Sequence, residues 1–294
     1  MMKNIIIGLG EILWDMLPSG KKLGGAPANF AYIVSQFGFD GYAVSAIGND
    51  LLGKEILDNL KEKKLNFLIE KVGFPTGTVA VTIDETGNPQ YEICKGVAWD
   101  NIPFTSQTEM LAKICCAVCF GSLAQRSEFS RNTILKFLEL VPEKALKIFD
   151  INLRQHFYSK EIIEKSLKIC NVLKMNDEEM VIISNLFEYQ GLSEDAICKK
   201  ILNDYQMKMV VLTKGETGSY IFTDDIVSYI ETPKVSVVDT VGAGDSFTGS
   251  LVAALFNGKT IQEAHRLAVE ISAYVCTQQG ATPEFPPKLT ELFK

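Results

Sequence analysis

Histidine is scarce in this sequence, which has only His156 and His265 among its 294 residues. Because histidine is the commonest metal ligand in proteins, this scarcity argues against a histidine-rich metal centre. A surplus of basic residues is also missing, since 29 Lys and Arg stand against 36 Asp and Glu and the net charge is −7. A surface that neutralises many backbone phosphates needs such a surplus, so we expect no nucleic-acid partner. A nucleotide needs none, because backbone N–H groups and one or two local cations can hold it.

Long apolar runs are absent as well. The three isoleucines at residues 5–7 form a run too short to span a membrane, and no signal-peptide cleavage pattern follows it. The seven cysteines are an odd number, and three of them lie in the apolar run 114–120. That placement is typical of a buried strand in a reducing compartment rather than of a disulfide framework. We therefore expect a cytoplasmic protein with no membrane partner.

The pattern of apolar residues indicates an α/β protein. Apolar residues make up 47% of the chain and charged residues 22%, the usual balance of a globular protein. Short apolar runs alternate with amphipathic stretches, which is typical of βα units around a mostly parallel sheet. We expect a doubly wound sheet flanked by helices, in a single domain over residues 1–294. The candidate strands are residues 4–8, 42–47, 114–120, 146–151, 171–175 and 209–213.

Two helices have clear boundary signals. Pro27 suits the first turn of a helix, and Gly38 suits its end. Thr260 and Glu263 have the spacing of a capping box, and the helix that they open is expected to reach Gly280.

Residues 76–95 interrupt this α/β pattern. The stretches 78–83 and 90–94 resemble strands and flank a turn-rich segment, so they predict an inserted hairpin. We expect a small inserted β lid formed by residues of about 12–22 and 76–100. Because an uncovered sheet invites a partner, a homodimer through the lid is a further expectation.

Two glycine patterns resemble nucleotide-binding motifs but lack a required residue. Gly8 and Gly10 follow the first strand like a dinucleotide-binding turn, yet Leu13 replaces the third glycine. Residues 48–54 resemble a P-loop until Glu55, which stands where a hydroxyl should bind Mg²⁺. We expect no cofactor site at the first pattern, and a turn followed by a helix at the second.

The strongest chemical signal is the run 239–247, Asp-Thr-Val-Gly-Ala-Gly-Asp-Ser-Phe. The small residues Gly242, Ala243 and Gly244 let a backbone approach a ligand closely. A helix that starts after them aims unpaired N–H groups at an anion. Asp245 lies in its first turn, where it either stabilises the helix or accepts the proton of an attacking hydroxyl.

A second signal is the run 24–31, Gly-Gly-Ala-Pro-Ala-Asn-Phe-Ala. Its paired glycines permit a tight backbone, and Asn29 offers a donor and an acceptor to a ligand hydroxyl. An ordinary junction between a loop and a helix is the alternative.

Together, the runs 24–31 and 239–247 resemble the two signature motifs of the ribokinase-like (PfkB) family of sugar kinases, and the resemblance covers essentially the whole chain. Fructokinase-type members are the most similar. The resemblance implies ATP-dependent transfer of the γ-phosphoryl group to a sugar hydroxyl, with Asp245 as the catalytic base. It also implies that residues 242–244 form the anion hole for the transferred phosphate.

Cofactor-binding residues follow from the same resemblance. Asn176 and Glu179 match the family's Asn-x-x-Glu element for Mg²⁺ and phosphate. Their spacing puts an amide and a carboxylate on one helix face, where they suit a hard cation held through water. The family's nucleotide loop is matched by Thr213, Lys214, Gly215 and Gly218. A plain turn is the alternative for the lysine.

Sugar-binding residues are implied in two places. Asp15 matches an acidic residue that grips sugar hydroxyls, and Gly25 and Asn29 match its partners. Asn152 and Arg154 lie in a segment similar to one in fructokinase-type members. The guanidinium of Arg154 is suited to offset phosphate charge through forked hydrogen bonds.

Two further assignments have open alternatives. Trp99 can stack on a sugar face, or it can be an exposed tryptophan that packs the lid against the main domain. The resemblance implies a K⁺ ion held by the carboxylate of Asp239 and by backbone carbonyls near Val241 and the turn at residues 280–281. The alternative is that Asp239 only orders the loop through backbone hydrogen bonds.

The substrate is left open, because the position of one hydroxyl is read by side-chain geometry. Fructose is favoured, and ribose, 2-keto-3-deoxygluconate or a nucleoside are alternatives on the same fold. The donor is open too, since Val269 replaces an asparagine that family members often carry near the adenine. A sugar or nucleotide sensor is an alternative of another class, opposed by the presence of Asp245, Asn176 and Glu179. A dinucleotide oxidoreductase is opposed by Leu13.

Overall fold

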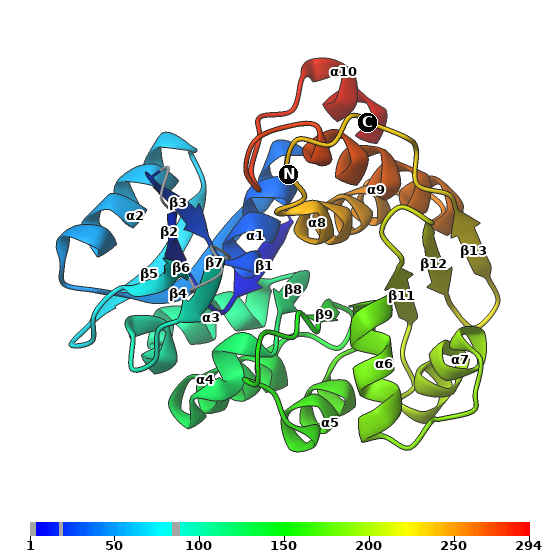
Figure 1. Ribbon diagram of the computed structural model, residues 1–294, viewed down its shortest axis with the longest axis horizontal. Coiled ribbons are helices and arrows are strands. Elements are labelled where there is room, and N and C mark those ends of the chain that lie inside the picture. The colour runs from blue at the N-terminus through cyan, green and yellow to red at the C-terminus, as the bar shows by residue number, and fades with distance from the viewer. Residues whose placement is uncertain (1–3, 18–19, 84–88) are drawn as a thin grey trace.

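A nine-stranded sheet forms the centre of the computed structural model, which describes residues 4–17, 20–83 and 89–294 (Figure 1). Its strands are β1 (Ile5–Leu9), β4 (Asp40–Gly48), β5 (Asn66–Val72), β8 (Ala117–Phe120), β9 (Leu146–Asp150), β10 (Val172–Asn176), β11 (Met209–Thr213), β12 (Ser219–Phe222) and β13 (Val227–Ile230). The order across the sheet is β13-β12-β11-β10-β9-β8-β1-β4-β5, and only the pairs β11–β12 and β12–β13 among these are antiparallel. The expected α/β fold with a mostly parallel sheet is confirmed.

Helices cover both faces of this sheet. They are α1 (Ala26–Gln36), α2 (Leu51–Glu62), α3 (Ser106–Ile114), α4 (Glu128–Leu140), α5 (Lys160–Ile169), α6 (Asp177–Leu186), α7 (Glu194–Asp204), α8 (Ala243–Phe256), α9 (Ile261–Cys276) and α10 (Pro287–Thr290). Three short 3₁₀ turns cover Ala98–Asn101, Leu123–Arg126 and Glu291–Phe293. The apolar sides of α1, α8 and α9 share one core cluster, and those of α3 to α7 share the cluster on the other face.

The apolar runs in the sequence mark the strands well. Every expected strand is present, and the largest shift is at β8, which begins at Ala117 because α3 extends to Ile114. Pro27 lies in the first turn of α1, as expected. The capping box of Thr260 and Glu263 opens α9, but the helix ends at Cys276 and not at Gly280. The carbonyl oxygen of Cys276 accepts instead from the N–H groups of Val238 and Asp239, so it is not available to continue the helix.

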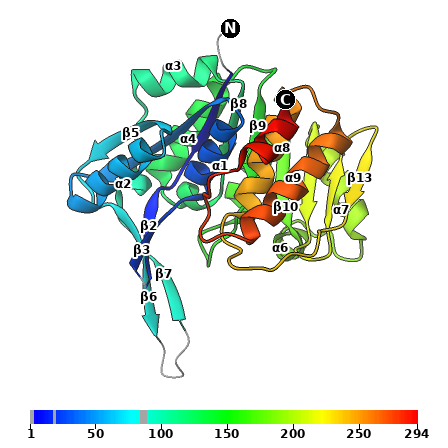
Figure 2. The ribbon, with the colours of Figure 1, turned by 90° about the horizontal axis from the view of Figure 1, so that it is seen from above.

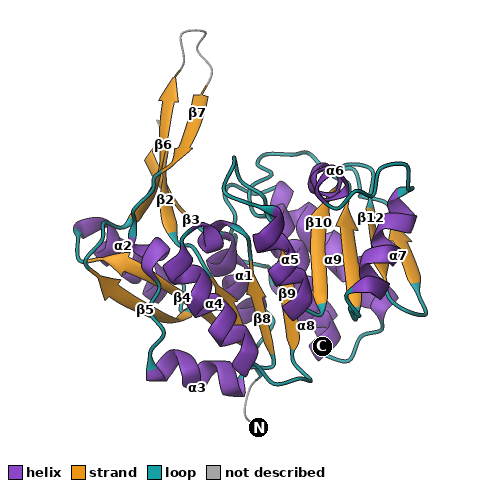
Figure 3. Cartoon of the chain, turned by 90° about the horizontal axis from the view of Figure 1, so that it is seen from below, coloured by secondary structure: helices purple, strands orange, loops and turns teal. Residues whose placement is uncertain are grey.

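A second, four-stranded sheet contains the predicted hairpin. Its strands are β2 (Leu13–Leu17), β3 (Gly20–Gly24), β6 (Gly77–Ile83) and β7 (Pro89–Ile93), in the order β3-β2-β6-β7. Figures 2 and 3 show β6 and β7 projecting away from the nine-stranded sheet. The last residues of the expected lid differ, because Ala98–Asn101 is a 3₁₀ turn whose first residues are buried in the main core. That this sheet closes over a ligand stays a prediction.

The topology places a ligand site near β1. The chain runs from β1 outward to β4 and β5, and then returns to β8 on the other side of β1. Ligands of doubly wound sheets bind at the carboxyl ends of the strands where the order reverses in this way. The segments that follow β1, β8, β9, β10 and β11 therefore define the candidate site.

Both glycine patterns near the N-terminus have structural explanations. A Cβ atom on Gly8 would lie 1.8 Å from the carbonyl oxygen of Pro27, so this glycine lets α1 cross β1 closely. In the second pattern, Asp50 caps α2 by accepting a hydrogen bond of 2.8 Å from the N–H of Gly53. The expected turn followed by a helix is confirmed there.

The seven cysteines all lie within the described ranges. All seven cysteines are free, and burial raises the pKa of Cys115 to about 12. A thiol with so high a pKa is a poor nucleophile. Within the described ranges, no helix is long and apolar enough to cross a membrane.

Candidate active site

The two sequence motifs meet where the N-termini of α1 and α8 lie side by side. Asn29 is in the first turns of α1, and Asp245 is in the first turn of α8. The Nδ2 of Asn29 donates a hydrogen bond of 2.7 Å to the Oδ2 of Asp245. Residues far apart in the sequence thus form one polar centre.

Residues 242–244, directly before Asp245, form a loop that we call the cradle. Two of its positions have no room for a side chain larger than that of glycine. Gly242 precedes α8 in the left-handed conformation with φ 80°, and a Cβ atom there would lie 2.5 Å from the Cα of Ala281. A Cβ atom on Gly244 would lie 2.9 Å from the Nζ of Lys174. No side chain caps the start of α8. The N–H of Ala243 donates to the carbonyl oxygen of Thr240 at 3.2 Å, so the free donors for an anion are the neighbouring N–H groups of the first turn, such as that of Gly244.

Asp245 has the pKa of a usable base. Burial and the neighbouring charge of Asp150 raise the pKa of its half-buried carboxyl to about 6. The hydrogen bond from Asn29 and the positive charges of Lys174 and Arg154 limit this rise. At neutral pH the carboxylate is mostly ionised and still basic enough to accept a proton, which is the property of an effective general base.

A buried ion pair lies beneath the cradle. Lys174 on β10 places Nζ 3.0 Å from the Oδ1 of Asp150 at the end of β9. Thr248 of α8 donates its hydroxyl to the Oδ2 of Asp150 at 3.0 Å. Burial lowers the pKa of Lys174, but the charges of Asp150 and Glu179 outweigh it and raise the pKa. A permanently charged ammonium therefore adjoins Gly244.

Lys174 has a sequence signal that the motifs did not reveal. It is the one charged residue in the otherwise apolar part of the expected strand 171–175. Because a lysine is almost never fully buried without a partner, such a residue marks a buried ion pair. The partner itself is set by the parallel pairing of β9 and β10, in which Lys174 stands opposite Asp150.

Asn176 and Glu179 form a capping box at the start of α6. The Oδ1 of Asn176 accepts from the N–H of Glu179 at 2.8 Å, and the Oε2 of Glu179 accepts from the N–H of Asn176 at 2.8 Å. The Oε1 of Glu179 accepts from the N–H of Leu153 at 2.9 Å, which fixes the segment after β9. Each of these oxygens keeps a second lone pair, which suits the hydration water of Mg²⁺ better than the metal itself. The residues present therefore fit a Mg²⁺ ion held through water.

The segment after β9 presents Arg154 to the site. Asn152 and Gln155 both have left-handed backbones, with φ 43° and 49°, which is uncommon outside glycine. Between them, the side chain of Arg154 is exposed. Its positive charge lowers the pKa of Asp15 and of Asp245, so it lies within electrostatic range of both carboxyl groups.

The expected sugar-side residues lie around the start of β2 and α1. Burial raises the pKa of the half-buried Asp15 on β2, and Arg154 opposes the rise. Gly25, with φ 119°, has no room for a side chain, since a Cβ atom would lie 2.5 Å from the carbonyl oxygen of Glu11. Asp15, Gly25 and Asn29 therefore line one region next to Asp245.

Glu11 is a site residue that sequence reasoning missed. Its side chain is buried, and its Oε2 has no hydrogen-bond partner in the described part of the chain. Burial raises its pKa to about 7, opposed by the charge of Arg154. The available signal was a single acidic residue in an otherwise apolar and glycine-containing stretch, residues 9–14.

Trp99 differs from both expectations. Its side chain is 0% exposed, so it is neither a surface tryptophan nor open to stacking on a sugar. The guanidinium of Arg126 lies 4.0 Å from the ring centroid. Arg126 in turn binds Asp100 through two hydrogen bonds of 2.8 and 2.9 Å. Trp99 is therefore a core residue at the base of the hairpin.

The expected nucleotide loop is a tight turn between β11 and β12. Thr213 ends β11 in register with Asn176, which brings the loop to the candidate site. Gly215 has φ 51°, and the N–H of Lys214 donates to the carbonyl oxygen of Gly218 at 2.8 Å. The ammonium of Lys214 forms an ion pair with Glu194 at 2.7 Å. This contact agrees with the alternative in which the lysine belongs to a plain turn.

Asp239 pins the loop that leads to the cradle. Its Oδ1 accepts from the N–H of Val241 at 3.0 Å, and its Oδ2 accepts from the N–H of Gly280 at 3.1 Å. Burial raises its pKa, but these two hydrogen bonds outweigh it and lower the pKa. These contacts match the alternative in which Asp239 orders the loop, and the K⁺ assignment stays a prediction.

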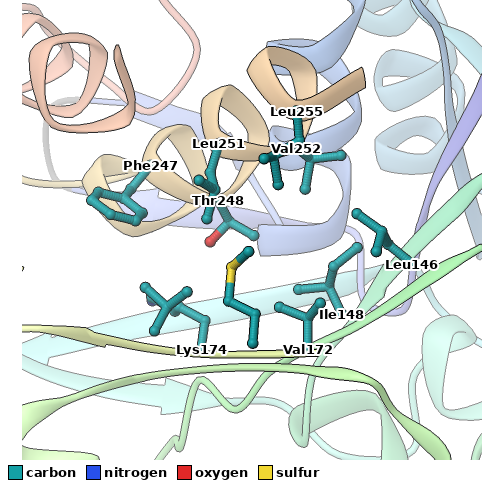
Figure 4. Close-up of a pocket in the computed structure, with 11 residues that line it drawn as sticks. Leu146, Ile148, Val172, Lys174, Phe247, Thr248, Leu251, Val252 and Leu255 are labelled. Atoms are coloured by element: carbon teal, nitrogen blue, oxygen red, sulfur yellow. The ribbon is translucent and has the colours of Figure 1, made fainter. Parts of the chain in front are cut away.

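An enclosed cavity beneath α8 is not a substrate site. Figure 4 shows it between α8 and the strands β9 and β10, with Lys174 and Thr248 among the side chains around it. Its volume is about 10 Å³, and the rest of its lining is apolar. This space is at the lower limit for one water molecule, so it is a packing gap.

Comparison with known proteins decides the family. Residues 19–288 match the model of the pfkB family carbohydrate kinases. The chain belongs to this family. It is therefore a carbohydrate kinase, a phosphotransferase with an alcohol group as acceptor.

The relatives of this pfkB-family kinase match it over nearly its whole length. A probable fructokinase from Arabidopsis thaliana is 28% identical, over 97% of this chain and 94% of the relative. The solved structure of an uncharacterized sugar kinase from Pyrococcus horikoshii has a TM-score of 0.83 at 23% identity, and covers 99% of this chain and 100% of its own. A fructokinase from Xylella fastidiosa with bound ATP has a TM-score of 0.83 at 21% identity, with 99% and 98% covered.

Proposed function

We propose that this kinase transfers the γ-phosphoryl group of ATP to a hydroxyl of fructose. The observation that carries the proposal is the hydrogen bond of 2.7 Å from Asn29 to Asp245 beside the glycine cradle. It joins a side chain suited to a sugar hydroxyl with a carboxylate suited to deprotonate one. The fructokinase names among the relatives favour fructose as the acceptor.

In this mechanism Asp245 accepts the proton of the sugar hydroxyl as the oxygen attacks the γ-phosphorus. A new P–O bond forms to the sugar, and the bond between the γ-phosphorus and the bridging oxygen breaks, leaving ADP. The N–H groups of Gly242, Ala243 and Gly244 stabilise the charge on the transferred phosphoryl group, and Arg154 adds a second donor set. The buried ammonium of Lys174 keeps the potential at Gly244 positive.

The cofactor sites follow from the same geometry. Asn176 and Glu179 would hold Mg²⁺ through its water, where the ion would offset the charge of the ATP phosphates. Thr213, Gly215 and Gly218 approach the nucleotide from the end of β11. Val269 lies on α9 and is buried in the protein core. Other residues therefore contact the adenine ring.

On the acceptor side, Asp15, Gly25, Asn29 and Asn152 bind the sugar hydroxyls. The four-stranded sheet acts as a lid that excludes water from the reaction. If so, fructose slows hydrogen exchange of the amides in β2, β6 and β7, and equal exchange with and without saturating fructose would argue against a lid. The uncovered face of the same sheet is the proposed dimer contact. If so, analytical ultracentrifugation should give twice the mass of one chain.

A panel of sugars tests the acceptor. Purified protein with ATP and Mg²⁺ is offered fructose, ribose, 2-keto-3-deoxygluconate and nucleosides, and ADP release is measured for each. We expect fructose to have the highest kcat/KM. A higher value for another acceptor would replace fructose, and sugar binding without ADP release for any acceptor would favour a sensor. Asp245→Asn serves as the matched control for contaminating kinase activity.

A further inference from the structure

Lys22 joins the second sheet to the loop that leads to the cradle. It lies on β3, and its Nζ is 3.7 Å from the Oδ2 of Asp239. The side chain of Lys22 is 47% exposed, whereas that of Asp239 is only 21% exposed. A lysine of the small sheet thus supplies a counter-charge to the half-buried carboxylate of Asp239, which precedes α8.

The position of Asp239 controls the shape of the cradle. Its two oxygens accept from the N–H groups of Val241 and Gly280, which belong to two different loops. Those loops meet at Gly242, where a Cβ atom would lie 2.5 Å from Ala281. There is no slack at this contact, so a shift of the Asp239 carboxylate moves the N–H groups of the anion cradle.

Lys22 gives the carboxylate of Asp239 a counter-charge in addition to its two hydrogen bonds. Its pKa is lowered by the two backbone hydrogen bonds, so it is ionised at neutral pH. In the described part of the chain, Lys22 is the one ammonium in salt-bridge range of it. Both oxygens already accept N–H donors, and the ammonium approaches Oδ2 at 3.7 Å.

We propose that the ammonium of Lys22 is a tethered cation that holds the cradle loop in place of a free K⁺ ion. Because it is carried by the chain, its effective concentration at Asp239 exceeds that of a dissolved ion. The loop of this kinase is then ordered in any salt. Lys22 acts through Asp239 and is a positioning residue.

The same lysine also faces the sugar side. Lys22 stands opposite Asp15 in the β2–β3 register, and its charge lowers the pKa of Asp15. If Asp15 binds the sugar, as the proposed function requires, Lys22 links the sugar region to the phosphate cradle. Movement of the small sheet then carries a charge toward or away from the loop.

Hydrogen exchange of the loop tests the tethered cation without any substrate. Peptides covering residues 239–244 and 278–282 are followed in KCl and in tetramethylammonium chloride at equal ionic strength. We expect wild type to exchange equally in both salts. In Lys22→Met, exchange in tetramethylammonium should be about two- to fivefold faster, the range for one partly exposed ion pair. KCl should restore the wild-type rate, because K⁺ then occupies the vacated position.

Lys21→Met is the matched control. Lys21 is the preceding residue of β3, and it pairs with Glu55 and lies 5.2 Å from the ring centroid of Trp14. Its removal takes away the same charge from the same strand without touching Asp239. This variant should exchange like wild type in both salts.

Two results would overturn the tethered cation. In the first, KCl slows the exchange of the wild-type loop, relative to tetramethylammonium chloride, as much as it slows that of Lys22→Met. A free ion would then hold the loop in both proteins. The other is unchanged exchange in Lys22→Met in tetramethylammonium. Since no sugar or nucleotide is present, these outcomes are independent of the sugar panel, whose failure would overturn the proposed function alone. With the acceptor known, kcat of Lys22→Met should fall in tetramethylammonium and recover in KCl.

Discussion

Asn29 donates a hydrogen bond of 2.7 Å to the carboxylate of Asp245 and so joins the two motifs of the chain. The contact does more than bring them together. A donor to a carboxylate stabilises the ionised form, and this hydrogen bond therefore limits the rise in the Asp245 pKa that burial and Asp150 cause. The amide thus keeps the base ionised at neutral pH.

The first prediction concerns Asp245→Asn. The variant keeps the shape of the side chain but cannot accept the proton of the hydroxyl, so kcat should fall by roughly 10² to 10⁴. ATP affinity, measured by calorimetry, should change little, because the cradle that holds the phosphates is made of backbone. A folded variant with near-normal kcat would remove Asp245 from the role of base.

The second prediction concerns pH. In wild type, kcat should decline as the pH falls through about 6, because Asp245 becomes protonated there. Asn29→Ala removes the donor that favours the ionised form, so the pKa of Asp245 rises and the acidic limb of the kcat profile moves to higher pH. The control is Asn152→Ala, because Asn152 is also expected on the sugar side but makes no hydrogen bond to Asp245. This variant should change KM and leave the acidic limb of the kcat profile at the wild-type pH. An unmoved limb in Asn29→Ala would contradict this account.

The sequence could predict the strands and the cradle because the residues that mark each of them are close together in the chain. Apolar runs mark buried parallel strands because such strands are covered on both faces. The cradle and Asp245 lie within one short segment, so glycine spacing and a helix start suffice to find them. The capping box of Asn176 and Glu179 is a local pattern of the same kind.

The sequence could not predict the contacts between segments that are far apart in the chain. Lys21 and Lys22 are neighbours in the sequence, yet only Lys22 reaches Asp239, because successive side chains of a strand point to opposite faces. The pairing of Lys174 with Asp150 depends on the register of β9 and β10. Trp99 has the residue type of a sugar platform, but it is buried in the main core, with Arg126 packed over its ring and Gly77 beside its indole nitrogen.

The third prediction concerns the ion pair beneath the cradle. Lys174→Met leaves the buried Asp150 without its cation, and Asp150→Asn leaves the buried Lys174 without its anion. Breaking a buried pair on one side costs about 3–5 kcal/mol of the free energy of unfolding. The double variant should lose less than the sum of the two single losses, because no lone charge remains. Urea unfolding of the four proteins measures this, and additive losses would mean that the two charges do not stabilise each other.

The last prediction concerns His265, which is buried between two hydroxyl groups. Its Nε2 lies 2.8 Å from the hydroxyl of Ser219, and its Nδ1 lies 2.9 Å from that of Ser228. Burial lowers its pKa from 6.5 to about 4, so folding favours the neutral ring. The stabilisation is complete above pH 6.5 and is lost as the pH falls toward 4, because the unfolded chain then binds a proton that the folded chain does not.

This shift is worth of the order of 3 kcal/mol, so wild type should lose that much free energy of unfolding between pH 6.5 and pH 4 through this ring alone. His265→Asn lacks the titration and should be less stable at pH 7 but fall less steeply with acid. Carboxyl groups contribute equally in both proteins, so the difference between their unfolding curves isolates the ring. Parallel curves for wild type and His265→Asn would show that the ring is protonated in the folded protein as readily as in the unfolded chain.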